Sequence, residues 1–125
     1  MFNDTKAFSG FAAPDLTAAR EFYEGKLGIR VTDEDGLLTL HLAGGERPTM
    51  IYVKPDFTPA TYTILNFPVA DIDAAVDALT GRGVEIERYE GFGQDERGIA
   101  REAGPPIAWF KDPAGNILSV LEIES

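Results

Sequence analysis

Two matching stretches of the chain decide the fold. The first reads DLTAAREFYEGK over residues 15–26, and the second reads DIDAAVDALTGR over residues 71–82. Aligned at a shift of 56 positions, they share an aspartate, a pair of alanines, an acidic residue, a glycine and a basic residue. Upstream, Phe11 falls on Phe67 at the same shift. An internal repeat of this kind indicates a fold built from two similar units.

Each stretch is predicted to form an amphipathic helix that begins after its aspartate. The side chains of Asp15 and Asp71 can accept the free amide hydrogens of the first helical turn. Apolar residues then recur at a spacing that places them on one helix face. These faces consist of Leu16, Ala19, Phe22 and Tyr23 in the first helix, and of Ile72, Ala75, Val76 and Leu79 in the second.

Short apolar or alternating runs around the helices predict strands. One strand is expected before each helix, at residues 7–13 and 62–69. Three more are expected after the first helix, at 30–32, 37–43 and 49–54, and three after the second, at 84–89, 107–111 and 117–122. Turn sequences such as DEDG at 33–36 and DPAGN at 112–116 separate them.

The predicted fold class is therefore α+β, with two tandem βαβββ modules in one domain that spans residues 1–125. Module one covers about residues 6–57 and module two about residues 60–124. One module cannot cover both faces of its own sheet, so we expect helices outside and a curved mixed sheet around a shared cleft. Strand alternation places Leu38, Leu40, Leu42, Ile51, Val53, Leu65, Phe67, Leu118 and Val120 in the core.

Composition narrows the possible partners. The 11 lysines and arginines against 21 aspartates and glutamates give a formal net charge of −10. This charge repels phosphate backbones, so we expect no nucleic-acid partner. No apolar run reaches the roughly 20 residues of a membrane helix, and the first residues do not read as a signal peptide. With cysteine also absent, we expect a cytoplasmic protein with no membrane partner.

Three motifs carry a family resemblance. Phe22-Tyr23 followed by Leu27-Gly28 ends the first helix, DID at 71–73 and GRGV at 81–84 frame the second, and DPAGN at 112–116 precedes the last strand. In this order they resemble the glyoxalase/bleomycin-resistance/dioxygenase superfamily, also called the vicinal oxygen chelate (VOC) superfamily. The resemblance implies the two-module fold, a ligand cleft and a homodimer. It does not specify an activity, because such folds host many chemistries.

The metal ligands that the resemblance implies are missing. The metal enzymes of the superfamily use His, Gln or Glu from the first and last strands of each module. The matching positions are Phe8 and Ile64 for the first strands, and Tyr52 and Ser119, aligned as equivalent strand centres, for the last. Phenylalanine and isoleucine have no lone pair, and neutral tyrosine and serine are poor ligands for divalent metals. We therefore expect no metal and no other cofactor.

The ligand is expected to contact side chains on the cleft side of the strands. The predicted ligand-binding residues are Phe8, His41, Tyr52, Lys54, Tyr62, Ile64, Asn66, Trp109 and Ser119. Trp109 can stack on a flat ligand or belong to the core, and Asn66 is expected to be a buried amide that needs partners. His41 can accept a ligand proton or bond to a neighbouring residue, whereas Lys54 is expected in solvent at a strand end.

One region departs from the repeat. Residues 90–106, EGFGQDERGIAREAGPP, stand where the first half has only a tight turn. A loop of this length is either a functional lid or a mobile segment, and the sequence leaves both interpretations open. Its charged run Asp95-Glu96-Arg97 is interpreted as a solvated surface rather than a gate.

The leading functional hypothesis is a small-molecule binder that works without a metal, through shape, stacking and a few polar contacts. The acidic surface is compatible with a cationic ligand. Whether the protein is an enzyme stays open. One alternative is a metal-independent lyase or isomerase with His41, Lys54 and Tyr52 as candidate acids and bases. Others are a metal-dependent VOC enzyme with a displaced site and a scaffold whose cavity is filled by side chains.

Overall fold

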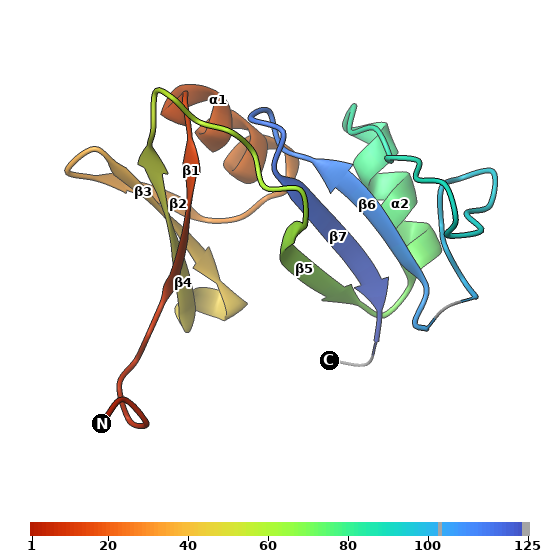
Figure 1. The fold of residues 1–125 in the computed structure, drawn as a ribbon, viewed down its shortest axis with the longest axis horizontal. Helices are drawn as coiled ribbons and strands as arrows, with labels where there is room; N and C mark the ends of the chain where they lie inside the picture. The colour runs from red at the N-terminus through yellow and green to blue at the C-terminus, as the bar shows by residue number, and fades with distance from the viewer. Residues whose placement is uncertain (103, 124–125) are drawn as a thin grey trace. The chain divides into compact units, whose positions relative to one another are not determined.

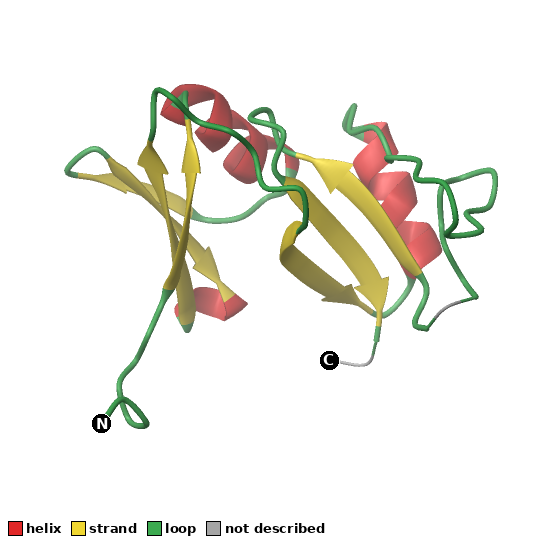
Figure 2. Ribbon diagram, in the orientation of Figure 1, coloured by secondary structure: helices red, strands yellow, loops and turns green. Residues whose placement is uncertain are grey.

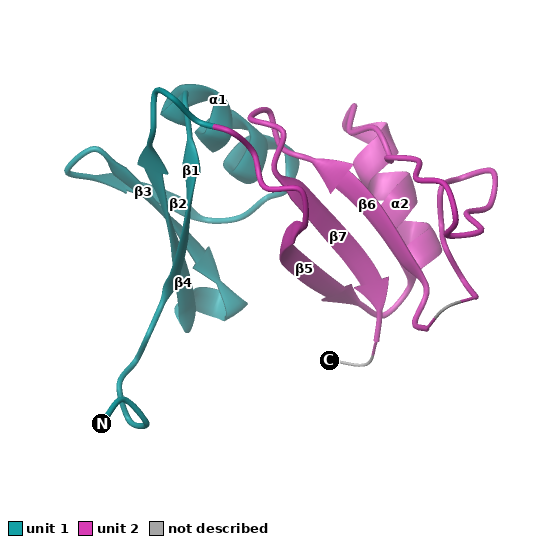
Figure 3. Ribbon diagram, in the orientation of Figure 1, with its two compact units in different colours: residues 1–57 teal, residues 58–125 magenta. Residues whose placement is uncertain are grey.

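The computed structural model describes residues 1–102 and 104–123 (Figure 1). The chain divides into two compact units, Met1–Phe57 and Thr58–Ser125 (Figure 3). Each unit has its own sheet with helical segments beside it (Figure 2), which confirms the predicted α+β class. None of the helices in the described part of the chain is long and apolar enough to cross a lipid bilayer.

The first unit contains four strands and three short helical segments. In chain order these are β1 (Ser9–Ala13), α1 (Leu16–Arg20), the π-helix η1 (Glu21–Lys26), β2 (Val31–Glu34), β3 (Leu37–Leu42), the 3₁₀ segment η2 (Ala43–Gly45) and β4 (Arg47–Val53). The sheet order is β1-β4-β3-β2. Strand β1 runs parallel to β4, and the other pairs are antiparallel.

The first helix begins where the sequence predicts and changes type midway. The backbone N–H of Ala18 donates to the Asp15 carboxylate at 3.2 Å, which confirms the N-cap. After Arg20 the helix widens, and the N–H of Leu27 donates to the carbonyl of Phe22, five residues earlier, at 3.0 Å. Both adjacent aromatic residues of this segment, Phe22 and Tyr23, are buried. The predicted helix is thus present, but its second half is a π-helix.

The described residues of the second unit form three strands and one longer helix. These are β5 (Thr63–Val69), α2 (Ile72–Gly81), β6 (Ile107–Lys111) and β7 (Ile117–Glu122). The sheet order is β5-β7-β6, with β5 parallel and β6 antiparallel to β7. The N–H of Ala74 donates to Asp71 at 3.1 Å, which confirms the second N-cap.

The core of the second unit lies between α2 and one face of its sheet. Helix α2 packs against β6 and β7. Fully or almost fully buried side chains fill this layer: Ile72, Val76, Leu79, Ala108, Phe110, Leu118 and Val120. The side chains that alternate with them on β6 and β7 point to the opposite face of the sheet, which α2 does not cover.

The strand predicted at residues 84–89 is absent. This segment makes one backbone hydrogen bond to β6, from the N–H of Glu87 to the carbonyl of Trp109 at 2.8 Å. The Gln94 side chain binds two further backbone groups of the segment: it accepts from the N–H of Tyr89 at 2.7 Å and donates to the carbonyl of Glu87 at 2.8 Å. A side chain therefore replaces the strand neighbour that the prediction assumed.

One core assignment in the first unit is also wrong. The sequence predicts burial for Val53, but 48% of its surface is exposed. It is the last residue of β4 and pairs with Ala13, the last residue of β1, so the strand ends before the helix can cover it. Leu38, Leu40 and Ile51 are buried as predicted.

Candidate functional site

Three of the predicted ligand residues, one on each strand of the second sheet, form one row. Asn66 on β5 pairs with Ser119 on β7, and Ser119 pairs with Trp109 on β6. Directly paired residues in a sheet project from the same face. This face lies opposite Phe110 and Leu118, which are buried on the α2 side. The row therefore occupies the face of the sheet that α2 does not cover, and for each unit we call the face away from its own helix the helix-free face.

Ser119 and Asn66 are joined within this row. The Ser119 hydroxyl donates to Oδ1 of Asn66 at 2.6 Å. Ser119 is fully buried, whereas Asn66 is exposed, so the expectation of a buried amide at residue 66 is wrong. Among the described residues nothing accepts from the Asn66 Nδ2 group. The exposed amide can therefore donate to a ligand while its oxygen is fixed by Ser119.

Trp109 belongs to an aromatic cluster with Tyr89 and Phe92. The ring centroids of Phe92 and Trp109 lie 4.9 Å apart, and those of Tyr89 and Trp109 lie 5.6 Å apart. Tyr89 and Phe92 meet edge-on at 6.3 Å. Phe92 is 44% exposed, and Trp109 is half-buried. We call Trp109, Tyr89 and Phe92 the aromatic platform.

The platform contains one unsatisfied polar atom. The Tyr89 hydroxyl is buried and has no hydrogen-bond partner among the described residues. Burial, and then the negative charge of Glu87, raise the pKa of Tyr89 above its ordinary value. The neutral phenol is therefore favoured, and it can donate a hydrogen bond to a ligand that reaches it. Glu87 is itself paired with Lys111 at 3.6 Å.

The other predicted residues of the second unit lie at the start of β5. Tyr62 precedes the strand and is 70% exposed. Ile64 is half-buried and lies at a register shift between Thr63 and Leu65, so it has no direct partner on β7. Neither residue belongs to the row of Asn66, Ser119 and Trp109.

In the first unit, strand alternation places His41 and Tyr52 on the helix-free face, as predicted. The His41 Nε2 atom lies 2.8 Å from Oγ1 of Thr32 on the neighbouring strand. His41 pairs with Pro48, and Tyr52 lies four residues further along β4. At about 3.3 Å per residue, His41 and Tyr52 are roughly 13 Å apart along the strand. The two residues are therefore not direct neighbours on this face.

Phe8 and Lys54 lie just outside the first sheet. Phe8 precedes β1 and is 65% exposed. Lys54 follows β4, and its Nζ atom pairs with the Asp56 carboxylate at 3.0 Å, both side chains being solvent-accessible. The prediction that Lys54 lies in solvent at the strand end is confirmed. The three acid–base candidates His41, Tyr52 and Lys54 are therefore not gathered into one catalytic group.

The positions that would hold the family's metal do not fit a cation. Phe8 and Ile64 have no donor atom, and the Ser119 hydroxyl is donated to Asn66. Among residues 1–102 and 104–123, no three histidine, aspartate or glutamate side chains are arranged to hold a metal ion.

Strand register also corrects the alignment of the two modules. Gly10 pairs with Met50, and its repeat equivalent Asn66 pairs with Ser119. Met50, rather than Tyr52, is therefore the counterpart of Ser119. The thioether of Met50 is hydrogen-bonded to Thr39 at 3.1 Å.

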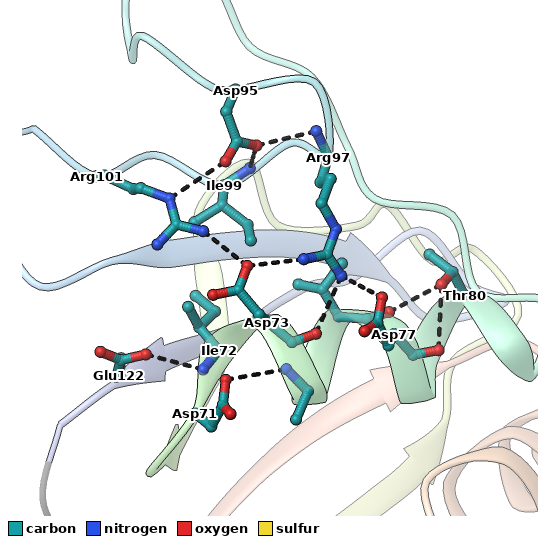
Figure 4. Close-up of polar contacts among 12 residues, drawn as sticks. Asp71, Ile72, Asp73, Asp77, Thr80, Asp95, Arg97, Ile99, Arg101 and Glu122 are labelled. Atoms are coloured by element: carbon teal, nitrogen blue, oxygen red, sulfur yellow. Dashed lines mark hydrogen bonds and ion pairs between the residues drawn. The ribbon is translucent and has the colours of Figure 1, made fainter.

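In its described part, the loop at 90–106 is attached to α2 by ion pairs. Arg97 donates to the Asp73 carboxylate at 2.7 Å and also binds Asp77, both on α2 (Figure 4). Arg101 binds Asp73 at 2.8 Å and Asp95 at 3.2 Å. The run Asp95-Glu96-Arg97 is thus ion-paired at its two ends, whereas Glu96 is exposed as predicted. Residue 103 lies outside the described residues.

An open groove of about 680 Å³ lies between the end of α2 and this loop. Its lining includes Val76, Thr80, Ile86, Arg88 and Arg97. None of the predicted ligand residues lines it. Helix α2 contributes Val76 and Thr80 to the groove, and no residue of the aromatic platform lines it.

Sequence reasoning missed Tyr89 and Phe92. The signal was present, because two aromatic residues flank a glycine in the stretch YEGF at 89–92. The prediction of a strand over 84–89 hid it by assigning Tyr89 to a regular ladder. Gln94, which fixes the backbone at Tyr89, carries no pattern that would indicate its role.

Comparison with known proteins agrees with this architecture. The family model of the Glyoxalase/Bleomycin resistance protein/Dioxygenase superfamily matches residues 8–120. No curated protein matches the sequence.

Several solved structures are similar over nearly the whole chain. A glyoxalase family protein from Enterococcus faecalis is 25% identical, with a TM-score of 0.71 over 98% of this chain and 100% of that chain. TnmS3, an antibiotic binding protein from Streptomyces sp. CB03234, is 21% identical, with a TM-score of 0.69 over 97% and 98%. The fosfomycin resistance protein FosX from Listeria monocytogenes is 14% identical, with a TM-score of 0.69 over 94% and 92%.

The family model covers most of the chain, and the internal repeat, the two capped helices and the strand order fit it. The chain belongs to the Glyoxalase/Bleomycin resistance protein/Dioxygenase superfamily.

Proposed function

We propose that this protein binds a flat small molecule without a metal, and that the helix-free face of the second sheet holds it. The observation that carries the proposal is the aromatic platform beside the exposed Asn66 amide. Aromatic rings offer a large apolar area for stacking, and a few fixed polar groups orient a ligand. Trp109 and Phe92 would supply the stacking surface, and Asn66 and the Tyr89 hydroxyl the polar contacts.

The helix-free face of the first sheet is part of the proposal. His41, held by Thr32, and the half-exposed Tyr52 offer ring surfaces and polar atoms there. Phe8, Lys54, Tyr62 and Ile64 stay proposed ligand contacts on the strength of the sequence. The prediction that the two sheets share one cleft also stays a prediction.

Two similar proteins support a role in small-molecule binding. TnmS3 is described as an antibiotic binding protein, and FosX as a fosfomycin resistance protein. Their low sequence identity to this chain leaves the ligand class to be decided by its own residues. The aromatic platform favours a planar ligand over a small aliphatic one, because stacking requires a flat partner.

Trp109 is the single tryptophan of the chain, so its fluorescence reports directly on the platform. We would titrate planar probes of different charge, namely proflavine, acridone and naphthalene sulfonate, into the full chain with EDTA present. Binding should quench the Trp109 emission. Calorimetry on Trp109→Ala should show a roughly 5- to 150-fold weaker interaction, because losing an aromatic stacking contact costs roughly 1–3 kcal/mol.

Phe2→Ala is the matched control. Phe2 is a 75% exposed aromatic residue in the N-terminal segment, outside the proposed site. This variant should bind the probes as the wild type does. Equal affinity of Trp109→Ala and the wild type would overturn the proposal. So would binding that appears only after Zn²⁺, Mn²⁺ or Fe²⁺ is added to the EDTA-treated protein.

No observation favours the lyase or isomerase alternative, because its three candidate residues lie apart. We further propose a homodimer in the cytoplasm, by resemblance to the family. Large exposed apolar side chains, among them Phe8 and Tyr62, would gain burial from a partner copy. Light scattering coupled to size-exclusion chromatography tests the dimer, and cell fractionation tests the location.

A further inference from the structure

The segment Gln94–Arg101, which we call the strap, is tied to α2 by ion pairs. Arg97 makes two hydrogen bonds to Asp73, one to the carboxylate at 2.7 Å and one to the backbone carbonyl at 3.0 Å, and a third to Asp77. Figure 4 shows Arg97 and Arg101 pointing from the strap towards the aspartates of α2. A guanidinium bound by two carboxylates and a carbonyl fixes direction as well as distance.

Asp95 makes the strap itself rigid. Its carboxylate accepts from the backbone N–H groups of Arg97 and Ile99, each at 2.9 Å. The backbone groups of Asp95 and Ile99 are also paired, at 2.9 Å. Ile99 is fully buried. The strap is therefore a compact turn held by its own hydrogen bonds.

The other end of the strap is fixed to the segment that carries the aromatic platform. The Gln94 side chain accepts from the N–H of Tyr89 and donates to the carbonyls of Glu87 and Gly98. Arg88 donates to the backbone carbonyls of Asp95, at 2.6 Å, and of Glu96. The side-chain anchors thus bridge the strap to the backbone next to Tyr89.

Phe92 lies between these two fixed points. Only residues 90–93 separate Tyr89 from Gln94, so the strap limits where the Phe92 ring can lie. In the structure this ring contacts both Tyr89 and Trp109. Displacing the strap would carry Phe92 away from Trp109 and leave the platform with two rings.

We propose that Arg97 is a positioning residue for the aromatic platform: it anchors the strap to α2 and thereby holds Phe92 against Trp109. The effect on ligand affinity rests on the function proposed above. The positional part is independent of it, because the contact between Phe92 and Trp109 exists without a ligand. Arg97 touches no ligand itself and acts through Phe92.

The first measurement needs no ligand. Acrylamide quenching of Trp109 fluorescence should increase in Arg97→Gln, because Phe92 no longer shields the indole. Arg97→Lys keeps one charge at this position and should restore part of the shielding. Arg20→Gln removes a half-exposed arginine of the first unit that pairs with Glu24 and donates to the carbonyl of Val31, and it should leave the quenching unchanged.

The second measurement is probe affinity in the same full-length variants. Arg97→Gln should raise the Kd of a bound planar probe about fivefold, the effect expected when a partly exposed ion-pair network is lost. In a Phe92→Ala background, Arg97→Gln should have no further effect, because the residue through which it acts is gone. Molar NaCl should weaken binding to the wild type more than to Arg97→Gln.

The outcomes separate the two proposals. Increased quenching without binding of any probe would support the positioning role and overturn the proposed function. Unchanged quenching in Arg97→Gln would overturn the positioning role, and a lower melting temperature alone would not rescue it. An additive Kd effect in the Phe92→Ala background would also overturn it.

Discussion

The two units differ most in the connection between the helix and the next paired strand. In the first, β2 pairs with β3 over the four residues from Val31 to Glu34. In the second, residues 84–89 make one backbone bond to β6, and the Gln94 side chain bonds to the backbone of Glu87 and Tyr89. The two N-caps are repeated, whereas the helices differ in their second halves, because the first turns π-helical after Arg20 and α2 stays α-helical.

The length of that connection explains the difference. Asp35 and Gly36 link β2 to β3 with φ angles of 53° and 77°, the conformation of a type I′ turn. Such a turn sets the strand register locally. In the second unit residues 90–106 stand in its place, and nothing local fixes register across them. Side-chain hydrogen bonds and ion pairs at several points hold this connection instead, and each of them requires ordered side chains.

The polar chemistry of the chain concentrates in this long connection. The described groups with clearly displaced pKa values, Tyr89, Asp95 and Arg101, all lie in or next to it. Hydrogen bonding to Asp95 raises the pKa of Arg101, so its charge is held still more firmly. A loop fastened by charged groups is sensitive to salt and pH in a way that a hairpin is not.

The largest expected effect tests whether the two cores are equivalent. Leu40 in the first unit and Leu118 in the second are both fully buried. Replacing either by alanine should lower the free energy of unfolding by about 2–5 kcal/mol, because the apolar contact is lost and a cavity is left. Urea unfolding followed by circular dichroism measures this for the whole chain, while Trp109 fluorescence follows the second unit.

If one of the two leucine-to-alanine variants lost less than about 1 kcal/mol of unfolding free energy, the two cores would not be equivalent. Coincident transitions by both probes would show that the units unfold together. Separate transitions would assign each core its own stability.

The sequence predicts the repeated parts of the fold because their causes are local. Asp15 and Asp71 cap helices through bonds to residues three positions later, and β6 and β7 begin and end where alternation places them. The π-helical turn after Arg20 and the irregular stretch at 84–89 escape prediction. The first follows the burial of two adjacent aromatic residues, and the second depends on Gln94, which no spacing rule connects to Tyr89.

The candidate site likewise contains residues that the sequence predicts and residues that it does not. Asn66, Ser119 and Trp109 are predictable because strand alternation and register place them on one face. Tyr89 and Phe92 are not, because only the fold of the long loop brings them to Trp109. The wrong pairing of Tyr52 with Ser119 has a similar origin: matching strand centres ignores register, which pairs Met50 with Gly10 and so identifies Met50 as the counterpart.

The next smaller effect on stability compares a glycine of the hairpin with a glycine of the strap, both of which have a positive φ. Gly36 has a φ of 77° with open space around it, whereas Gly98 has a φ of 89° and a Cβ added there would lie 2.5 Å from Cγ2 of Ile86. Gly36→Ala should lower the free energy of unfolding by about 1 kcal/mol, because alanine is strained at this positive φ. Alanine at residue 98 should cost about 1–3 kcal/mol more, because Ile86 must also move.

Thermal unfolding of Gly36→Ala and Gly98→Ala measures this difference. Increased acrylamide quenching of Trp109 in Gly98→Ala, but not in Gly36→Ala, would show that the strap has shifted as well. Equal destabilisation of the two variants would mean that Ile86 yields without cost and that the strap is packed more loosely than its contacts indicate.

The smallest expected effect concerns the acid sensitivity of the strap. Burial alone would raise the pKa of Asp95, but hydrogen bonds from the N–H groups of Ile99 and Arg97 and from Arg101, with the charge of Arg101, lower it below the ordinary value. A carboxyl whose folded pKa is depressed stabilises the fold above its unfolded pKa of about 3.9, and this contribution is lost as the pH falls through the folded pKa. Below about pH 4, wild-type stability should therefore fall more steeply than that of Asp95→Asn.

Melting temperatures measured from neutral pH down into this range test the sign. Asp4→Asn, which removes a carboxylate from the exposed N-terminal segment, is the matched control and should follow the wild type. Because the Asp95 side chain is 33% exposed, solvent screening keeps its contribution small. Parallel acid curves for Asp95→Asn and the wild type would mean that backbone packing around Ile99, rather than the carboxylate, holds the strap. The long connection would then resemble the hairpin of the first unit more than its charges suggest.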